Sequence, residues 1–169
     1  MISHDTGKFF SIIGVKVSGA KGREVNSWTQ PMMKQNECGI LGIICQKKEG
    51  VMRYLLYAKY EPGNMHKLQL SPTLQATASN LGLAHGGKKP LFVEYFEGNK
   101  GKVLVDAESV EDGGRFYLKT NRNIVVEISE NEKIQVPDDF IWVTLPQFKR
   151  LLRMDVVVNS LVRSVMGSW

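Results

Sequence analysis

Four apolar runs in the first part of the chain constrain its fold most. They cover residues 9–19, 25–32, 38–46 and 51–60, and β-branched and aromatic side chains are frequent in each of them. Such side chains favour strands, and the glycine-containing sequences AKGRE and KKEG between them are typical of turns. We therefore predict a strand in each run, and a strand-rich first two thirds of the chain.

The strand pattern weakens further along the chain. Many polar side chains and Pro72 interrupt residues 68–80, which favours a mixture of strand and loop over a regular element. Residues 90–97 and 139–145 again have the apolar and aromatic composition of strands.

The spacing of side chains changes after Gly113 to that of a helix. A helix brings residues three and four positions apart onto one face, and Asp112 is a suitable N-cap. We therefore predict a helix that starts here. The side chains on its common face are Tyr117, Asn121, Ile124 and Ile128.

Two more helices are predicted near the end of the chain. Pro146 suits the first turn of a short helix that runs to Leu152. Asp155 is a plausible cap for a last helix that ends at Gly167. The apolar face of this last helix would hold Val158, Leu161, Val162 and Val165. The expected fold is an α+β domain with a mixed β-sheet and a few helices.

Length and composition limit the class of protein. The chain has 169 residues, so we expect one domain over residues 1–169. Its 43% hydrophobic and 23% charged residues are ordinary for a globular protein. We find no apolar run long enough to span a membrane and no signal peptide, and therefore expect a cytoplasmic protein. The net charge of +5 favours an anionic small molecule as readily as a nucleic acid, and no block of Lys and Arg supports the latter.

The two cysteines predict neither a disulfide nor a metal site. Cys38 and Cys45 lie seven positions apart in one predicted strand, so their side chains point to opposite faces. Reduced thiols are expected in the cytoplasm. The sequence contains no CxxC pair and no cluster of His and Cys, so we expect no bound metal.

The most unusual stretch of the sequence is the polar one that follows the fourth predicted strand. Lys59 and Glu61 share one strand face with Tyr57 and precede the turn signal PGN. One interpretation is a ligand groove, with Lys59 facing a phosphate; the other is a polar surface loop, and composition leaves both open. The side chains that would line the groove are Gln69, Ser71, Thr73, Gln75, Ser79 and Asn80.

Three further features could take part in binding. Trp28 and Gln30 alternate onto one side of a strand and could form a stacking surface beside an amide, or a core Trp beside an exposed Gln. Arg115, Lys119 and Arg122 form a basic stripe at the start of the predicted helix, where backbone N–H groups and the helix dipole attract phosphate. A solvated helix face would have the same pattern. His66 is the best placed histidine because it lies within the polar stretch.

The order of these motifs resembles the NDP-hexose 2,3-dehydratase family. The resemblance runs from about His4 to Val165, and the sequences AKYEPGN and QLSPTLQAT are its most distinctive parts. It implies a Nudix-like fold and an enzyme of deoxysugar biosynthesis, a lyase that dehydrates dTDP-4-keto-6-deoxyglucose. Members of the family contain two tandem copies of the unit, and this chain has the length of one.

The resemblance to Nudix proteins does not extend to their metal site. Nudix hydrolases carry the signature G-x5-E-x7-R-E-x-x-E-E, whose glutamates hold Mg²⁺. Counting from Gly114, the first glutamate position is Thr120, and Glu127 stands alone in the following segment. A divalent cation needs several oxygen ligands. A metal-dependent pyrophosphohydrolase is therefore disfavoured, and the resemblance implies a reaction that uses no metal or redox cofactor.

The resemblance also suggests a role for each candidate residue. Trp28 would stack on the nucleotide, while Lys59, Arg115 and Arg122 would contact the diphosphate. Glu61 is the first candidate for proton transfer, followed by His66 and Tyr117. The residues expected to line the sugar and base pockets are Gln30, Asn64, Gln69, Ser71, Thr73, Gln75 and Asn80.

Two classes of function remain open at this point. One is a lyase made from a single unit, and the other is a non-catalytic domain that binds a dTDP-sugar. A single unit would leave exposed the surface that a second unit covers, so we expect a homodimer, with the last helix and Trp169 as one possible interface.

Overall fold

The described part of the chain forms two β-sheets and four short helices. A computed structural model describes residues 1–7, 9–82, 86, 88–98 and 100–169. The smaller sheet has the order β1-β2-β3-β9, formed by β1 (Ile2–Ser3), β2 (Ser11–Ser18), β3 (Ser27–Lys34) and β9 (Phe116–Tyr117). The larger sheet has the order β11-β5-β4-β10-β8, with β6 and β7 joined to β5 and β4. Its strands are β4 (Gly39–Lys48), β5 (Val51–Tyr60), β6 (Leu68–Ser71), β7 (Leu74–Ala76), β8 (Lys102–Val110), β10 (Thr120–Ile128) and β11 (Phe140–Thr144).

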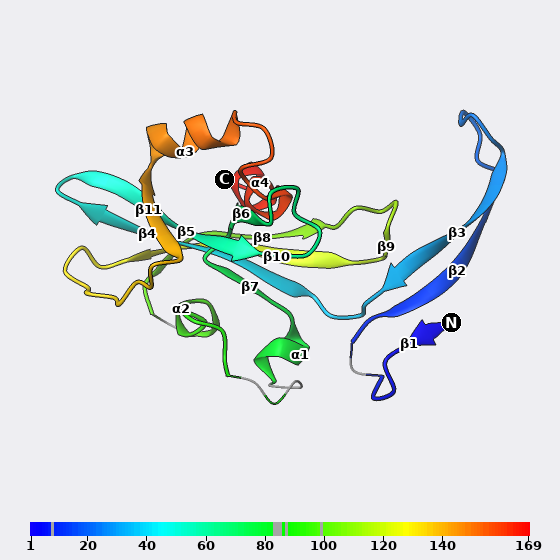
Figure 1. Cartoon of the computed structure of the whole chain (residues 1–169), viewed down its shortest axis with the longest axis horizontal. Helices are drawn as coiled ribbons and strands as arrows, with labels where there is room; N and C mark the ends of the chain where they lie inside the picture. Colours follow the sequence, from blue (N-terminus) through cyan, green and yellow to red (C-terminus); the bar gives the residue numbers. More distant parts are fainter. Residues whose placement is uncertain (8, 83–85, 87, 99) are drawn as a thin grey trace.

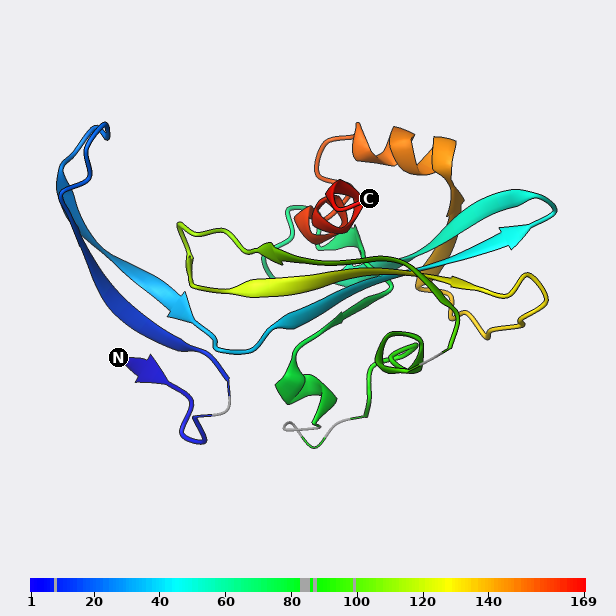
Figure 2. The ribbon, with the colours of Figure 1, turned by 180° about the vertical axis from the view of Figure 1, so that it is seen from behind.

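The helices lie on both faces of the larger sheet. Figures 1 and 2 show α3 (Leu145–Leu152) and α4 (Ser160–Gly167) on one face, and α1 (Ala78–Leu81) and α2 (Glu94–Glu97) on the other. The sheet is mixed, because β10 runs parallel to β4 while its other neighbour, β8, is antiparallel.

Alternation along the central strands produces two cores, because successive side chains of a strand point to opposite faces. Ile43 and Val125 pack on the α3 and α4 side with Phe148. Ile44 and Ile124, their direct neighbours in sequence, pack on the other side. Both faces of the larger sheet are therefore covered. For this reason the central parts of β4 and β10 consist mainly of apolar residues.

The β2–β3 hairpin projects from the body of the molecule. In Figures 1 and 2 it leaves the end of the larger sheet and extends beyond all other elements. Residues 11–34, the hairpin and its turn, are called the arm below. Two residues of β9 pair with the base of the arm, through Met33 and Lys34.

Several predicted elements are confirmed. Strands β2, β3, β4 and β5 fall within or across the four apolar runs, and β11 forms at residues 140–144. Pro146 lies in the first turn of α3, where Thr144 and Gln147 form a capping box. The predicted α+β class is also confirmed, with mixed sheets and few helices.

The helix predicted after Gly113 is wrong. This segment forms β9 and β10, and β10 pairs with β4 and β8 along its length. The physical reason is the β-branched run from Ile124 to Ile128, which suits a strand buried on both faces better than a helix. The basic stripe at a helix N-terminus, with Arg115, Lys119 and Arg122, therefore does not exist.

Two smaller predictions are also corrected. Residues 90–97 form a turn and α2 in place of a strand. The last helix is capped by Asn159, whose Oδ1 accepts from the backbone N–H of Leu161 at 2.9 Å, and not by Asp155. The apolar side chains of α4 include Val162 and Val165, which are buried in the core, so they offer no exposed patch.

No helix in the described ranges is long and apolar enough to cross a membrane.

Candidate functional site

An opening between β5 and β7 lies at the centre of the candidate site. β4 pairs with β5 through residues 44–48 and with β7 through residues 40–42, while β5 continues by pairing with β6. Strands β5 and β7 therefore diverge, and Pro72 with Thr73 forms the short connection from β6 to β7.

Thr73 fixes the point at which the strands separate. Its hydroxyl accepts from the backbone N–H of Ile44 at 3.0 Å and donates to the carbonyl of Leu55. The Thr73 hydroxyl thus satisfies one backbone N–H of β4 and one backbone carbonyl of β5. Both groups are buried, where an unpaired backbone group would be unfavourable.

Lys59 and Gln75 bridge the opening. Lys59 Nζ lies 2.8 Å from Gln75 Oε1 and 2.9 Å from Glu61 Oε1. Glu61 is held in turn by Asn159, whose Nδ2 donates to Glu61 Oε2 at 3.3 Å and to Gln69 Oε1 at 3.4 Å. The predicted polar stretch therefore does form a connected network, and it is attached to the cap of α4.

Two small cavities flank this bridge, and both are lined by Lys59 and Gln75. The first has a volume of about 200 Å³ and is called the polar cavity. The second has a volume of about 210 Å³ and is called the aromatic cavity. The side chains that give the polar cavity its character are Gln35, Asn80, Glu111, Lys119 and Asn121, with Leu41, Phe116 and Leu161 as apolar walls.

Lys119 is the most unusual residue of the polar cavity. It is only 6% exposed, and its Nζ donates to the backbone carbonyl of Glu37. Burial lowers the pKa of its ammonium group, while the nearby Cys38, Glu37 and Glu111 act in the opposite direction. Leu118 has a φ of 52°, and this left-handed residue connects β9 to β10 just before the inward-pointing Lys119.

Asn121 and Glu111 form the opposite part of the polar cavity. Asn121 Nδ2 donates to Glu111 Oε2, and Asn121 is buried. A Cβ atom on Gly39, its partner across the parallel β4–β10 pair, would lie 2.4 Å from Asn121 Oδ1. Position 39 therefore needs glycine to make room for this amide.

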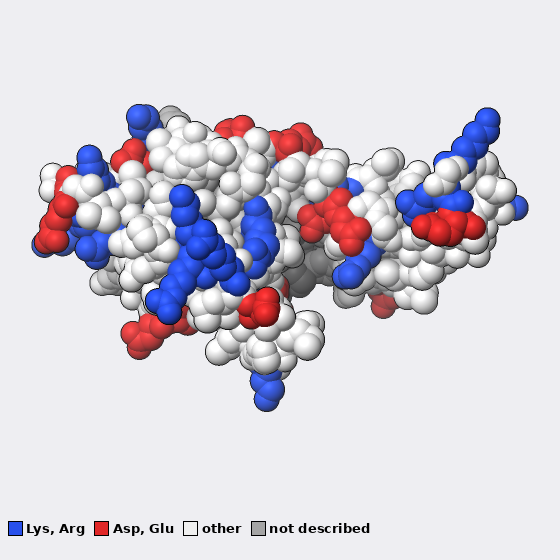
Figure 3. All heavy atoms as spheres, turned by 90° about the horizontal axis from the view of Figure 1, so that it is seen from above, with Lys and Arg blue, Asp and Glu red and all other residues white. Residues whose placement is uncertain are grey.

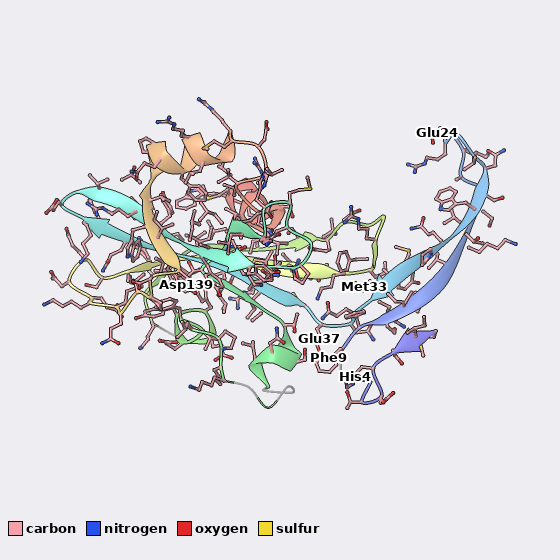
Figure 4. All side chains as sticks on the ribbon, viewed as in Figure 1. His4, Phe9, Glu24, Met33, Glu37 and Asp139 are labelled. Carbon is pink, nitrogen blue, oxygen red and sulfur yellow. The ribbon has the colours of Figure 1, made fainter. Side chains whose placement is uncertain are left out.

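The base of the arm meets the same region through Glu37. Ser79 of α1 donates to Glu37 Oε2 from both its backbone N–H, at 3.2 Å, and its hydroxyl, at 3.0 Å. Figure 4 shows Glu37 and Phe9 close together at this junction. A cavity of about 640 Å³ lies here, and its lining includes Phe9, Phe10, Lys34 and Glu37.

The aromatic cavity has a flat wall. Tyr57 of β5 and Phe140 of β11 stack with ring centroids 4.5 Å apart and an interplanar angle of 10°. Burial raises the pKa of the Tyr57 hydroxyl, and Asp139 adds to the increase. Figure 4 shows where Asp139 lies at the start of β11. The other lining residues are Thr73, Leu74, Pro90 and Leu91.

Some predicted residues lie at these cavities and others have structural positions beside them. Lys59, Gln75 and Asn80 line the polar cavity, and Thr73 lines the aromatic one. Asn64 holds its own turn by donating to the carbonyls of Lys59 and Lys67, both at 3.3 Å. The remaining members of the polar stretch are Ser71, which is buried, Gln69, which donates to the Val156 carbonyl at 3.0 Å, and His66, which is exposed in the turn.

A second group of predicted residues lies elsewhere. Trp28 and Gln30 share one side of the arm as expected, with a bond of 2.7 Å from Trp28 Nε1 to Gln30 Oε1, but neither lines the two cavities. The Arg115 side chain is 83% exposed beside Asp112, and Tyr117 is exposed in β9.

Arg122 also lies away from the polar cavity. It makes two bonds to the Asp106 carboxylate, at 2.6 and 2.7 Å. Because Asn121 and Asn123 flank it in a strand, Arg122 points to the face opposite theirs.

Sequence reasoning missed Glu111, Lys119 and Asn121 as members of one site. The available signal was the alternation of Asn121 and Asn123 in a segment that continues with the β-branched residues of positions 124–126. Asn123 is fully buried and donates to Ser109 Oγ at 2.7 Å. A buried polar side chain at every second position of a strand indicates one polar face.

Comparisons with known proteins give the family. The sequence model of the NDP-hexose 2,3-dehydratase family matches residues 1–168. The chain belongs to this family. A dTDP-4-dehydro-6-deoxy-alpha-D-glucopyranose 2,3-dehydratase from Saccharopolyspora spinosa is 48% identical over 165 residues, which cover 97% of this chain and 33% of that protein. A protein of the same name from Amycolatopsis orientalis is 41% identical over 169 residues, which cover 97% of this chain and 36% of that protein. This member of the NDP-hexose 2,3-dehydratase family thus spans about a third of the length of these curated relatives.

The fold is also found among solved structures. A crystal structure of an ADP compounds hydrolase matches with a TM-score of 0.55 at 13% identity, over 94% of this chain and 83% of that one. The similarity concerns the fold alone, and it confirms the expected Nudix-like α+β architecture. Among the described residues, no group of three or more His, Cys, Asp or Glu is arranged to hold a metal ion.

Proposed function

We propose that this unit binds dTDP-4-keto-6-deoxyglucose and removes water across C2 and C3 of its sugar, as a lyase of deoxysugar biosynthesis. The names of the relatives at 41–48% identity support this activity. Because the chain spans about a third of each relative, the activity of those longer proteins comes to this unit as a proposal.

The observation that carries the proposal is the pair of cavities that share Lys59. Pockets for drug-sized ligands have volumes of about 300–1,000 Å³. Each cavity here is smaller, at about 200 and 210 Å³, and suits one ring of a larger ligand. A dTDP-sugar contains a base, a deoxyribose, a diphosphate and a hexose in that order. The aromatic cavity, the shared ammonium group and the polar cavity would take the base, the diphosphate and the hexose in the same order.

The aromatic cavity would take the thymine ring. The stacked Tyr57 and Phe140 rings supply a flat wall, and Gln75 and Asp139 supply groups that donate to and accept from a base. The diphosphate would lie at Lys59, where it replaces Gln75 as a partner of the ammonium group. Glu61 positions Lys59 through their 2.9 Å ion pair.

The polar cavity would hold the 4-ketohexose during dehydration. The C4 ketone acidifies the proton on C3, and the Glu111 carboxylate takes this proton. The electrons of the C3–H bond form an enolate, whose C4 oxygen accepts a hydrogen bond from the Lys119 ammonium group. Buried, preorganised donors of this kind stabilise an oxyanion strongly because water does not compete with them.

The second half of the reaction expels the hydroxyl group. The C2–O bond breaks as the enolate collapses, and the proton on Glu111 moves to the departing oxygen to form water. A double bond between C2 and C3 remains, and the ketone is restored. One proton is taken and one is returned, so the sequence of steps needs no metal and no redox cofactor. His66 and Tyr117 lie outside both cavities, and we assign them no role in it.

The cellular context is also proposed. The free thiols of Cys38 and Cys45 suit the cytoplasm, where thiols stay reduced. We propose a homodimer that acts on its small-molecule substrate without nucleic acid or membrane.

Two measurements test the function. Calorimetry with dTDP in the presence of EDTA should show binding, and the Phe140→Ala variant should bind dTDP more weakly. Mass spectrometry of dTDP-4-keto-6-deoxyglucose incubated with the chain should show the loss of one water. Binding without turnover would favour the non-catalytic dTDP-sugar binding domain, and the absence of binding would contradict both functions.

A further inference from the structure

The side chain of Asn159 connects the last helix to the polar network around Lys59. Asn159 is 9% exposed and follows Glu61 by 98 positions in the sequence. Its Oδ1 accepts from the backbone N–H of Leu161 at 2.9 Å, and this contact caps α4. Because a backbone N–H only donates, the contact fixes which end of the amide is the oxygen. The Nδ2 end therefore points to the network, where it donates to Glu61 and Gln69.

The backbone holds Asn159 at a defined place beside β6. The N–H of Leu70 donates to the carbonyl of Val157, and the N–H of Asn159 donates to the carbonyl of Leu70, both at 2.9 Å. On the other side, α4 is anchored by Val162 and Val165, which are buried in the core. Backbone pairing and the core thus fix Asn159 from two directions. A donor on such a rigid support can orient a neighbouring group.

Glu61 passes this orientation on to Lys59. Its Oε2 accepts from Asn159 and its Oε1 contacts Lys59 Nζ, so both carboxylate oxygens have a partner. Lys59 Nζ also donates to Gln75 Oε1 at 2.8 Å. An ammonium group has three N–H donors, so within the described ranges these two contacts leave one donor of Lys59 for a ligand. The direction of that donor is set by the positions of Glu61 and Gln75.

We propose that Asn159 is a positioning residue for the diphosphate site: by holding Glu61, it directs the remaining N–H of Lys59 towards the ligand. This inference rests on the proposed function, which places the diphosphate at Lys59. Lysine has a long, flexible side chain, and fixing it before the ligand arrives removes part of the entropic cost of binding. Asparagine suits this place because its amide combines the acceptor that α4 needs with the donor that Glu61 needs.

Replacing Asn159 by serine separates the two ends of the amide. Serine caps helices about as well as asparagine, so α4 should form and the free energy of unfolding should stay nearly unchanged. The serine hydroxyl is engaged in the cap, and the donor to Glu61 is lost. Calorimetry should show a dissociation constant for dTDP that rises on the order of tenfold, the effect of one hydrogen bond. The dissociation constant of thymidine, which has no diphosphate, should not change in an NMR titration.

A double-mutant cycle with Lys59→Met tests whether Asn159 acts through Lys59. Asn159→Ser should weaken dTDP binding in the otherwise unmodified chain. It should have no further effect in Lys59→Met, because the group that Asn159 orients is gone. A residue with a purely structural role would cause the same change in both backgrounds.

The matched control addresses the general charge of the same face. Figure 3, which looks onto α3 and α4, shows basic side chains gathered over these helices. Such exposed charges attract anions without fixing a geometry, and salt screens them. Arg163 is exposed on α4, so Arg163→Ser changes the charge of this face and leaves the network intact. This variant should change the dissociation constant of dTDP by less than about twofold at an ionic strength of about 0.15 M.

A loss of dTDP affinity in Asn159→Ser that disappears in the Lys59→Met background would support the positioning role. Unchanged affinity in Asn159→Ser, or an equal loss in both backgrounds, would overturn that role while dTDP binding itself stands. A loss as large in Arg163→Ser would overturn it too, because the charge of the face would then explain the effect. No binding of dTDP by the unmodified chain would contradict the proposed function, and the role of Asn159 with it.

Discussion

Replacing Lys119 by methionine should separate the chemistry of the polar cavity from its stability. Methionine has a similar length and no charge, so it removes the ammonium group from a side chain that is only 6% exposed. Removing one donor to a developing oxyanion typically lowers kcat by about 10²–10³, or about 2.7–4 kcal/mol of barrier. We expect a loss of turnover in this range.

The stability of the same variant should not fall in parallel. Burial is the largest effect on the Lys119 ammonium group and lowers its pKa, so removing the charge relieves an unfavourable burial of charge in the folded state. Lys119 does donate to the Glu37 carbonyl, and the loss of this bond offsets part of the gain. We therefore expect the free energy of unfolding of Lys119→Met to equal or exceed that of the unmodified protein at neutral pH.

The difference between the two proteins should depend on pH. Folding lowers the pKa of Lys119, so the unfolded chain binds this proton more tightly. The cost of burying the charge is therefore present at neutral pH and declines as the pH rises through the folded-state pKa towards the ordinary value of 10.5. The stability of the unmodified protein should rise relative to Lys119→Met over that window.

The assay combines turnover, followed by mass spectrometry with the protein in excess, with chemical denaturation at several pH values. Lys67→Met, at an exposed position in the turn before β6, is the control and should change neither quantity. Turnover of Lys119→Met within threefold of the control would refute the oxyanion role. A large loss of stability would instead identify Lys119 as a structural residue.

Three further predictions follow from the geometry. Thr73→Val removes the hydroxyl that joins β4 and β5 and leaves the Ile44 N–H buried without this acceptor. Thermal denaturation should show that the free energy of unfolding falls by about 1–3 kcal/mol. Unchanged stability would mean that the opening does not depend on Thr73. Lys59→Met should weaken dTDP binding by about 1.5–3 kcal/mol in calorimetry, whereas Arg115→Ala should not, and the reverse result would place the diphosphate near β9. Burial raises the pKa of the Cys45 thiol to about 12, so a thiol reagent at pH 8 should label the exposed Cys38 and leave Cys45 unmodified in the folded protein.

Local sequence patterns predicted the strands and part of the site. Lys59 and Glu61 could be placed on one strand face because a strand alternates its side chains, and the resemblance to a family placed them in a ligand site. A groove could be predicted from the polar stretch because the turn signal after β5 indicates that the chain reverses direction there.

The other half of the site depends on contacts that are distant in the sequence. Lys119 contacts the carbonyl of Glu37 because β10 pairs in parallel with β4. Parallel strands are joined by a long connection, so no local sequence pattern predicts that these two residues are neighbours. The helix predicted from Tyr117 to Ile128 failed because three- and four-residue spacings occur by chance in a strand that is apolar on both faces. The β-branched composition of Ile124 to Ile128 was the better signal.

The most direct test of the proposed dehydration is a single-turnover experiment with dTDP-4-keto-6-deoxyglucose and excess protein, comparing the unmodified chain with Glu111→Gln. Glutamine keeps the hydrogen-bonding shape of Glu111 beside Asn121 but cannot take a proton from C3. Glu108→Gln, a change at an exposed residue of β8, is the matched control. The proposal predicts loss of one water with the unmodified chain and the control, and an intact substrate with Glu111→Gln. Equal dehydration by all three proteins, or none by any of them, would contradict it.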